Sequence, residues 1–181
     1  MLSMHGVVHG VVPETFCYKG SNGVGGSMET KETAGVIARP PLLYLAGLII
    51  GLVLRALAPT PFLPRGITFL LGAALIVIAV WLLTRGVREM HRAGTSEKTS
   101  VPTTALVTTG PFRFSRNPLY VSLTLAYLGI AVAAQSLWAL ALLALVLVVM
   151  QQGVIGREER YLERKFGADY LRYKQRVRRW I

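Results

Sequence analysis

The sequence predicts an all-α polytopic membrane protein, with about four transmembrane helices in two hairpins and an amphipathic C-terminal helix in the cytoplasm. Two observations carry this prediction. Of the 181 residues, 52% are apolar and only 16% are charged, whereas a soluble domain carries about a quarter charged residues. The charged residues are also segregated, so that long stretches of the chain hold none. Both properties are typical of a chain that crosses a lipid bilayer several times.

The longest charge-free stretch covers residues 117–156 and predicts a helical hairpin. At about 1.5 Å per residue it would form roughly 60 Å of helix, twice the roughly 30 Å thickness of the hydrocarbon layer. Its most polar point, Gln135 and Ser136, lies at its middle. We therefore expect two spans, near 118–134 and 137–152, joined by a tight turn.

Two further spans are expected upstream, near 41–58 and 66–84. Residues 66–84 carry no charge, whereas the run at 41–58 is long enough only if Arg55 extends its side chain to the membrane surface. The segment "APTPFLPRG" between them contains three prolines, which end a helix. The whole membrane domain is expected to cover residues 35–181. Residues 1–34 are rich in glycine and lack an apolar helical run, so we expect a disordered leader there, with Met28 as an alternative first residue.

The basic residues predict the orientation of the chain. The segments 85–117 and 153–181 are rich in arginine and lysine, whereas the turn at 135–136 carries no charge. The positive-inside rule then places both termini in the cytoplasm, at the cytoplasmic membrane if the chain is bacterial, and brings both basic segments to one membrane face. With a net charge of +11 and no nucleic-acid-binding motif, the expected partners are membrane lipids and not nucleic acid.

A disulfide or a thiolate metal centre is not expected, because Cys17 is the one cysteine of the chain. We therefore predict no metal site. The oligomeric state stays open.

The motif "SRNPLY" at residues 115–120 marks the cytoplasmic start of the third predicted span. Asn117 is a favourable N-cap and Pro118 a favourable first helical residue. The free N–H groups and the dipole of this helix start favour an anion, and Arg113 and Arg116 lie beside it in the sequence. The simpler alternative is a capped helix whose arginines only contact lipid phosphates.

A helix that starts near Ile155 would place an acidic residue among apolar ones. Ile155, Leu162 and Phe166 fall on one face, which Glu159 shares and Glu158 borders. A carboxylate on an apolar face needs a partner, because burying it alone is costly. Two partners stay open: an arginine from the 115–120 motif, or a ligand with a positive charge or hydroxyl donors. Most basic residues of the tail are expected to hold it on anionic headgroups.

Two segments, "GPFRFSRNPLY" and "REERYLERKFGADYLRYKQRVRRWI", separated by a hydrophobic hairpin, resemble the isoprenylcysteine carboxyl methyltransferase and phospholipid methyltransferase superfamily. The resemblance covers roughly residues 90–181, and "HRAGTS" at 91–96 is similar to an element of its compact bacterial members. It implies an integral membrane methyltransferase that uses S-adenosyl-L-methionine at the cytoplasmic face. By position it implies Arg116 and Tyr120 as catalytic residues. The cofactor-binding residues that it implies are Gly110, Pro111, Arg113, Arg116, Asn117, Pro118, Tyr120, Glu158, Glu159, Tyr170 and Tyr173.

Asn117 departs from the family pattern, which has histidine at this position. Asparagine can donate a hydrogen bond but cannot titrate. The methyl acceptor therefore stays open between a prenylated or lipidic carboxylate, a lipid amine and a small apolar metabolite. Two rival functions also stay open: a membrane reductase of the steroid-reductase type that uses a nicotinamide dinucleotide, and a non-enzymatic scaffold. The Glu-Glu pair followed by Phe-Gly-x-x-Tyr favours the methyltransferase.

Overall fold

The computed structural model describes residues 39–95 and 103–181, and the elements within them are all helical. The all-α prediction is confirmed for these residues, while the predicted leader at 1–34 lies outside them. In chain order the elements are α1 (Pro40–Leu57), α2 (Arg65–Arg92), the 3₁₀ helix η1 (Gly110–Arg113), α3 (Pro118–Ala133), α4 (Leu137–Val149), the π-helical segment η2 (Met150–Ile155), α5 (Gly156–Phe166) and α6 (Ala168–Arg176).

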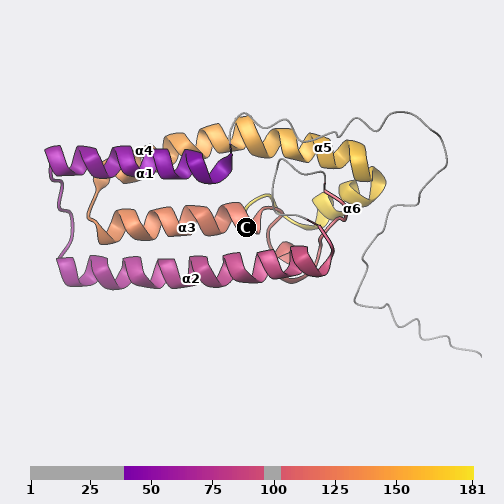
Figure 1. Cartoon of the computed structure of the whole chain (residues 1–181), viewed down its shortest axis with the longest axis horizontal. Helices are drawn as coiled ribbons and strands as arrows, with labels where there is room; N and C mark the ends of the chain where they lie inside the picture. Colours follow the sequence, from indigo (N-terminus) through magenta and orange to yellow (C-terminus); the bar gives the residue numbers. More distant parts are fainter. Residues whose placement is uncertain (1–38, 96–102) are drawn as a thin grey trace, which may run out of the picture.

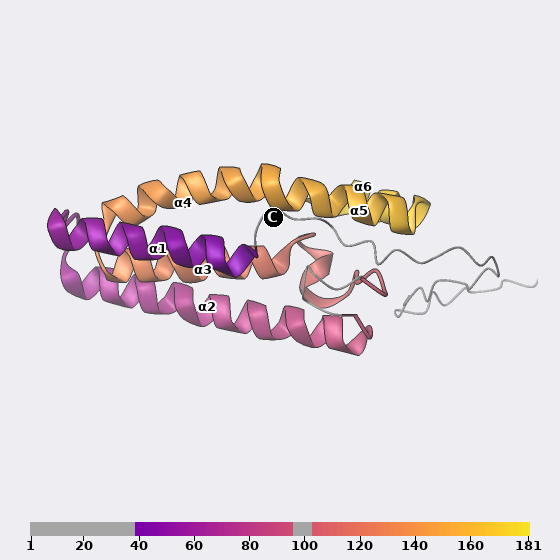
Figure 2. The same cartoon turned by 45° about the horizontal axis from the view of Figure 1, so that its top comes forward.

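The first four α-helices lie side by side along the long axis of the molecule (Figures 1 and 2). Helix α3 packs against α2, and α1 packs against α4. The connections α1–α2 and α3–α4 lie at one end of this bundle, whereas η1, α5 and α6 lie at the other end (Figure 1). The two basic segments of the sequence therefore share one end of the molecule.

Three helices are long and apolar enough to cross a membrane: Pro40–Leu57, Arg65–Arg92 and the continuous column Leu137–Phe166. Their large apolar side chains are widely exposed, as in Phe69 (67%) and Leu70 (70%), which suits contact with lipid tails. The protein is therefore an integral membrane protein. Helix α3 has 16 residues and is about 24 Å long, shorter than the roughly 30 Å hydrocarbon layer. The fourth span stays a prediction.

The bundle is packed through small residues at which two backbones come close together. A Cβ atom added to Gly72 of α2 would lie 2.5 Å from the carbonyl oxygen of Gly129 in α3. One added to Gly51 of α1 would lie 2.5 Å from the Cα atom of Ala139 in α4. Such contacts hold helices together in lipid, where a hydrophobic driving force between them is absent.

The turn between α3 and α4 falls at Gln135 and Ser136, the most polar point of the charge-free run. Gln135 has a φ of 52°. The Nε2 atom of its side chain donates to the carbonyl oxygen of Leu63 over 2.6 Å. The Ser136 hydroxyl accepts from the Ala139 amide and donates to the carbonyl oxygen of Gly51. These bonds satisfy backbone groups that lipid cannot hydrogen-bond.

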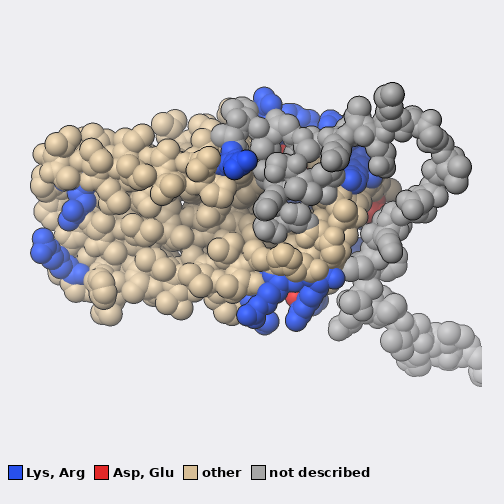
Figure 3. Space-filling view, viewed as in Figure 1, with Lys and Arg blue, Asp and Glu red and all other residues tan. Residues whose placement is uncertain are grey.

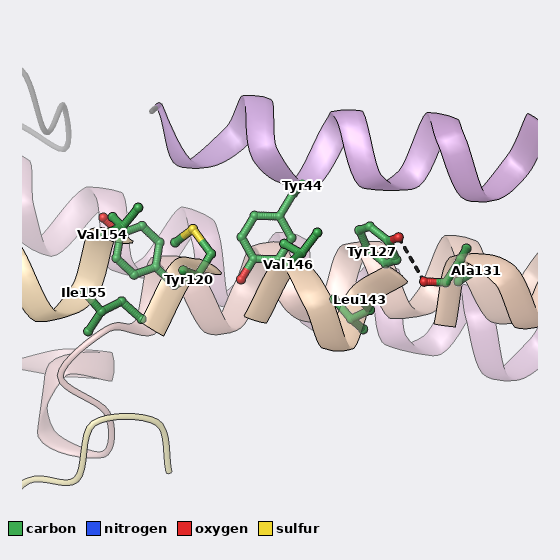
Figure 4. Close-up of a cluster of buried hydrophobic side chains, with 10 residues drawn as sticks. Tyr44, Tyr120, Tyr127, Ala131, Leu143, Val146, Val154 and Ile155 are labelled. Carbon is green, nitrogen blue, oxygen red and sulfur yellow. Dashed lines mark hydrogen bonds between the residues drawn. The ribbon is translucent and has the colours of Figure 1, made fainter. Parts of the chain in front are cut away.

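The apolar core extends along the bundle up to its polar end. Tyr44 of α1 packs edge-on against Tyr127 of α3, with ring centroids 6.3 Å apart. Near the start of α3, Tyr120 lies beside Val154 and Ile155 of η2 (Figure 4). The same core therefore supports both the membrane-spanning part and the start of α5.

The segment η2 joins α4 to α5 without a break in the helical column. A π-helical turn contains one residue more than an α-helical turn, and such turns are frequent at functional sites. The C-terminal helix predicted from Ile155 onward is divided at Gly167, whose φ of 52° separates α5 from α6.

Candidate functional site

The site begins at the corner, defined here as residues 110–118, which leads from η1 into α3. Gly110 has a φ of 57° and lies against Glu89 of α2, because a Cβ atom there would meet the Glu89 Cγ atom at 2.6 Å. The buried Ser115 hydroxyl accepts from the Asn117 amide. Pro118 then opens α3. The backbone of the corner is therefore held from both sides.

Asn117 occupies the N-cap position of α3, but its side chain makes no capping bond. Its Nδ2 atom instead donates to the carbonyl oxygen of Arg179 over 3.0 Å. The expectation that Asn117 caps the helix with its side chain is therefore wrong. The physical reason is a competing acceptor, which the end of the chain brings to the corner.

Glu159 of α5 is the charged centre of the site and is only 5% exposed. Its Oε1 atom lies 3.1 Å from the Nη1 atom of Arg116. Arg179 also binds it with two nitrogens, at 2.9 and 2.6 Å. The predicted arginine partner from the corner is thus present, and a second arginine joins it. We call Arg116, Glu159 and Arg179 the ionic cluster.

Glu158 and Tyr120 form a second polar pair next to the ionic cluster. The Tyr120 hydroxyl of α3 donates to the Oε2 atom of Glu158 over 2.8 Å. Tyr120 is buried, and its ring belongs to the apolar core described above. This pair therefore stands where the core of the bundle meets the charged groups.

The two predicted tyrosines of α6 are buried behind the ionic cluster. Tyr170 and Tyr173 pack edge-on, with ring centroids 6.2 Å apart, and the Tyr173 hydroxyl donates to the carbonyl oxygen of Phe112 in η1. Burial, supported by the charge of Glu159, raises the pKa of Tyr170 to about 12. Burial also raises the pKa of Tyr173 above its ordinary value. Both phenols therefore stay protonated at neutral pH.

The tail, defined as Val177–Ile181, contacts both the corner and η2. The Arg116 amide donates to the carbonyl oxygen of Arg178, and the Ser115 hydroxyl donates to that of Arg179. The Trp180 indole donates to the Oε1 atom of Gln151 in η2. Sequence reasoning missed Arg179 as a site residue, because it treated the basic tail as a set of equivalent lipid contacts. The one available signal was Glu159, which needed a partner.

Arg116 keeps hydrogen-bonding capacity that the cluster does not use. Its side chain is only 9% exposed, yet its Nε and Nη1 atoms make no hydrogen bond in the described structure. The Nη1 atom is near Glu159 without hydrogen-bond geometry. Buried polar atoms without a partner are rare and costly. Nε and Nη1 of Arg116 are therefore donors whose hydrogen bonds the ionic cluster leaves unmade.

The other predicted site residues, Gly110, Pro111, Arg113 and Pro118, are not part of the ionic cluster. They line a cavity of about 560 Å³ between the corner and α2. The residues predicted from the sequence are thus divided between two places. Within the part of the chain that the structure describes, no three His, Cys, Asp or Glu residues come together as a metal site.

Three curated proteins are similar to parts of this chain. An uncharacterized protein of Haemophilus influenzae is 47% identical over 68 residues, which are 35% of this chain and 100% of that protein. The cobalt-zinc-cadmium resistance protein CzcN of Cupriavidus metallidurans is 39% identical over 72 residues, 40% of this chain and 33% of that protein. The nickel-cobalt-cadmium resistance protein NccN of Alcaligenes xylosoxydans is 39% identical over 71 residues, which are 38% of this chain and 33% of that protein. The chain spans only a third of the length of these two resistance proteins.

The phospholipid methyltransferase family matches residues 67–169, a region that runs from the start of α2 through the corner and α5 into α6. This match covers more than half of the chain and confirms the resemblance found in the sequence. By this match and by the apolar helices that carry the site, the chain belongs to the phospholipid methyltransferase family, a family of membrane methyltransferases.

Proposed function

We propose that this protein is an integral membrane methyltransferase that uses S-adenosyl-L-methionine and acts on a lipidic or apolar acceptor at the cytoplasmic face. The observation that carries the proposal is the buried Arg116, whose Nε and Nη1 atoms lack a hydrogen-bond partner next to the acidic Glu159. Family membership supplies the reaction class. With both basic segments at one end of the molecule (Figure 1), the positive-inside rule supports cytoplasmic termini.

The residues of the site fit the charges of this cofactor. Arg116 would hold the carboxylate, because its unused nitrogens can form charge-assisted hydrogen bonds. Glu159, and Glu158 beside it, would hold the ammonium or the ribose hydroxyls. Tyr120, Tyr170 and Tyr173 would shape the walls around it. When bound, the cofactor supplies a methyl group on a sulfonium, which is already an activated leaving group.

The corner would position the cofactor through its backbone. Asn117 and Pro118 set the direction of α3, and Gly110 with Pro111 begins the turn that leads to Arg116. Arg113 adds positive charge at the same membrane surface. These roles require the corner to be rigid, and the bonds from Ser115 and Asn117 to the tail provide that rigidity.

Arg179 of the tail already binds Glu159, the residue that we assign to the ammonium or the ribose of the cofactor. Arg179 binds both carboxylate oxygens of Glu159, and the hydrogen bond to Glu159 raises the pKa of Arg179 further above its ordinary value. An ammonium or a ribose at Glu159 would have to share or replace this contact. We therefore propose that the side chain of Arg179 moves when the cofactor binds, while its carbonyl oxygen keeps the bonds to Ser115 and Asn117.

The acceptor would approach from the apolar side of Tyr120. Its ring lies in the core with Val154 and Ile155 (Figure 4). Its hydroxyl donates to Glu158. An apolar body can therefore stay in the bundle while its reacting group meets the charged groups. A carboxylate acceptor is ionised at neutral pH and needs no base. Catalysis then depends mainly on positioning and on exclusion of water.

Isothermal titration calorimetry of the full chain in nanodiscs tests the proposal. S-adenosylhomocysteine, the product of methyl transfer, is the probe, and a nicotinamide dinucleotide is the control ligand. Micromolar binding of S-adenosylhomocysteine alone is the expected result. Binding of the dinucleotide alone would favour the reductase, and binding of neither by folded protein would favour the scaffold.

A further inference from the structure

The cavity between α2 and the corner has two unlike halves. One half is apolar and includes Trp81, Leu82 and Val121. The other half is charged and includes Arg85, Glu89 and Arg113. Ser115 of the corner and Ile181 of the tail also line it, but none of the three residues of the ionic cluster does. The cavity therefore adjoins the site, on the α2 side of the corner, without including its charged residues.

The charged half carries an excess of positive charge. Glu89 is already engaged, because Arg92 binds its Oε1 atom and the Thr109 hydroxyl binds its Oε2 atom, each over 2.8 Å. Within the described residues, Arg85 and Arg113 have no carboxylate partner, and Arg85 lies 5.9 Å from the ring centre of Trp81. Basic side chains flank an acidic one over the last turns of α2 (Figure 3). Two unpaired guanidinium groups at one cavity favour an anion between them.

The position of the cavity along α2 indicates what kind of anion it suits. Helix α2 has 28 residues, about 42 Å, so its last turns extend beyond a hydrocarbon layer of roughly 30 Å. Trp81 is 58% exposed and begins the charged end, as tryptophans do at the membrane surface. Val77 and Ile78, one turn deeper, are also exposed. The arginines thus lie at headgroup level, directly above a lipid-facing apolar surface.

We propose that this cavity binds one anionic phospholipid whose phosphate lies between Arg85 and Arg113. Its glycerol and first methylene groups contact Trp81, Leu82 and Val121. A free phosphate ion would use only the charged half of the cavity, whereas an anionic lipid matches both halves. This lipid is a bound component and not the methyl acceptor, because none of the three residues of the ionic cluster lines the cavity.

Native mass spectrometry of the full chain in detergent, with a short-chain phosphatidylglycerol as the probe, tests the proposal. We expect one bound phosphatidylglycerol molecule, held more tightly than short-chain phosphatidylcholine. Arg85→Gln and Arg113→Gln should each weaken binding about tenfold, the loss of one charge-assisted hydrogen bond. Arg160→Gln is the matched control, since it removes the same charge from an exposed position of α5. No methyl donor is present, so the result does not depend on the proposed enzymatic function.

Phe114→Glu provides a second variant with little risk to folding, because Phe114 is 76% exposed at the rim of the cavity. The added negative charge should also weaken the binding of phosphatidylglycerol. Inorganic phosphate at millimolar concentration should not displace the lipid. Displacement by inorganic phosphate, an equal loss in Arg160→Gln, or the absence of a bound lipid would each overturn the proposal.

Discussion

The two ends of this molecule are built by different means. In the bundle, the closest contacts between helices α1 to α4 join backbone to backbone at glycine and alanine, with uncharged hydrogen bonds at the α3–α4 turn. At the polar end, the corner, α5, α6 and the tail meet through ion pairs and hydrogen bonds between side chains or from side chains to backbone. Figure 3 shows basic side chains gathered mainly at this end.

The difference teaches where the molecule can change without losing its fold. The backbone contacts at Gly51 and Gly72 leave no room for an added atom, so the helices are closely packed at these points. Ion pairs with partly exposed partners, such as Arg179 with a side chain 31% exposed, can be exchanged for pairs with a ligand. The bundle therefore serves as the fixed support, and the polar end is the part that responds.

The largest effect is expected where the bundle is closest packed. Gly72→Leu should lower the free energy of unfolding by about 3 kcal/mol, because its side chain would collide with the backbone of α3. Thermal unfolding in detergent, followed by the loss of helical circular dichroism, measures this. Gly66→Leu is the control, since no atom lies within 4 Å of a Cβ added there. Equal destabilisation of both variants would contradict the close contact of α2 and α3.

A somewhat smaller loss is expected at the centre of the ionic cluster. Glu159→Gln leaves Arg116 and Arg179 without their carboxylate, and we expect a loss of about 2 kcal/mol, less than for a fully buried pair. Affinity for S-adenosylhomocysteine should fall at least about tenfold. Calorimetry and thermal unfolding measure the two effects. The control Glu163→Gln breaks only the partly exposed pair with Lys174. An unchanged affinity would remove Glu159 from the cofactor site.

The tail offers a change whose two effects have opposite signs. Arg179→Gln should lower the free energy of unfolding by about 1 kcal/mol, because it removes one partly exposed ion pair. It should also raise the affinity for S-adenosylhomocysteine about threefold, since Glu159 no longer has to exchange partners. Arg178→Gln, at an exposed position of the same tail, is the control. A weaker affinity in Arg179→Gln would show that the arginine helps to bind the cofactor.

The last effect is a dependence of stability on alkaline pH, and it appears only outside the physiological range. Tyr170 has a pKa raised from 10.0 to about 12. Below pH 10.0 both the folded and the unfolded chain keep the phenol protonated. Above it the unfolded chain ionises first, so the free energy of unfolding should fall by about 1 kcal/mol as pH approaches 12. Tyr170→Phe should lack this part of the decrease. An equal decrease in the free energy of unfolding of the two proteins between pH 10 and 12 would contradict the burial of the phenol.

Much of the bundle could be predicted from the sequence, because lipid imposes long apolar helices and places polar residues at turns. The charge-free run at 117–156 indicated a hairpin, and the turn lies at its most polar point. Helix α3 covers Pro118–Ala133, 16 residues, within one residue of the expected 118–134. The sequence could not show what holds its start, because the side chain of Asn117 bonds to Arg179, which comes from the distant end of the chain.

The charged site was predictable only in part. Helical periodicity placed Glu159 on an apolar face, which correctly implied a buried partner. Periodicity could not select Arg179, because this residue reaches Glu159 through a tail without regular structure, and several arginines near it look alike in sequence. The sequence also could not show that Arg113 and Arg116 have different surroundings. Three residues apart in a turn, they face different sides of the corner.

The π-helical segment Met150–Ile155 decides which charge faces inward from α5. Met150 is buried, and in a continuous α-helix Arg157, seven residues later, would follow it on nearly the same side, about 20° away. The additional residue of the π turn changes the helical phase by about 100°. The acidic pair Glu158 and Glu159 then lies on the inner side, where Glu159 is buried and Glu158 half-buried, and Arg157 is exposed. The rotation of α5 about its axis therefore determines the sign of the charge that this helix presents to the interior. The additional residue of the π turn places an anion where a continuous α-helix would place a cation.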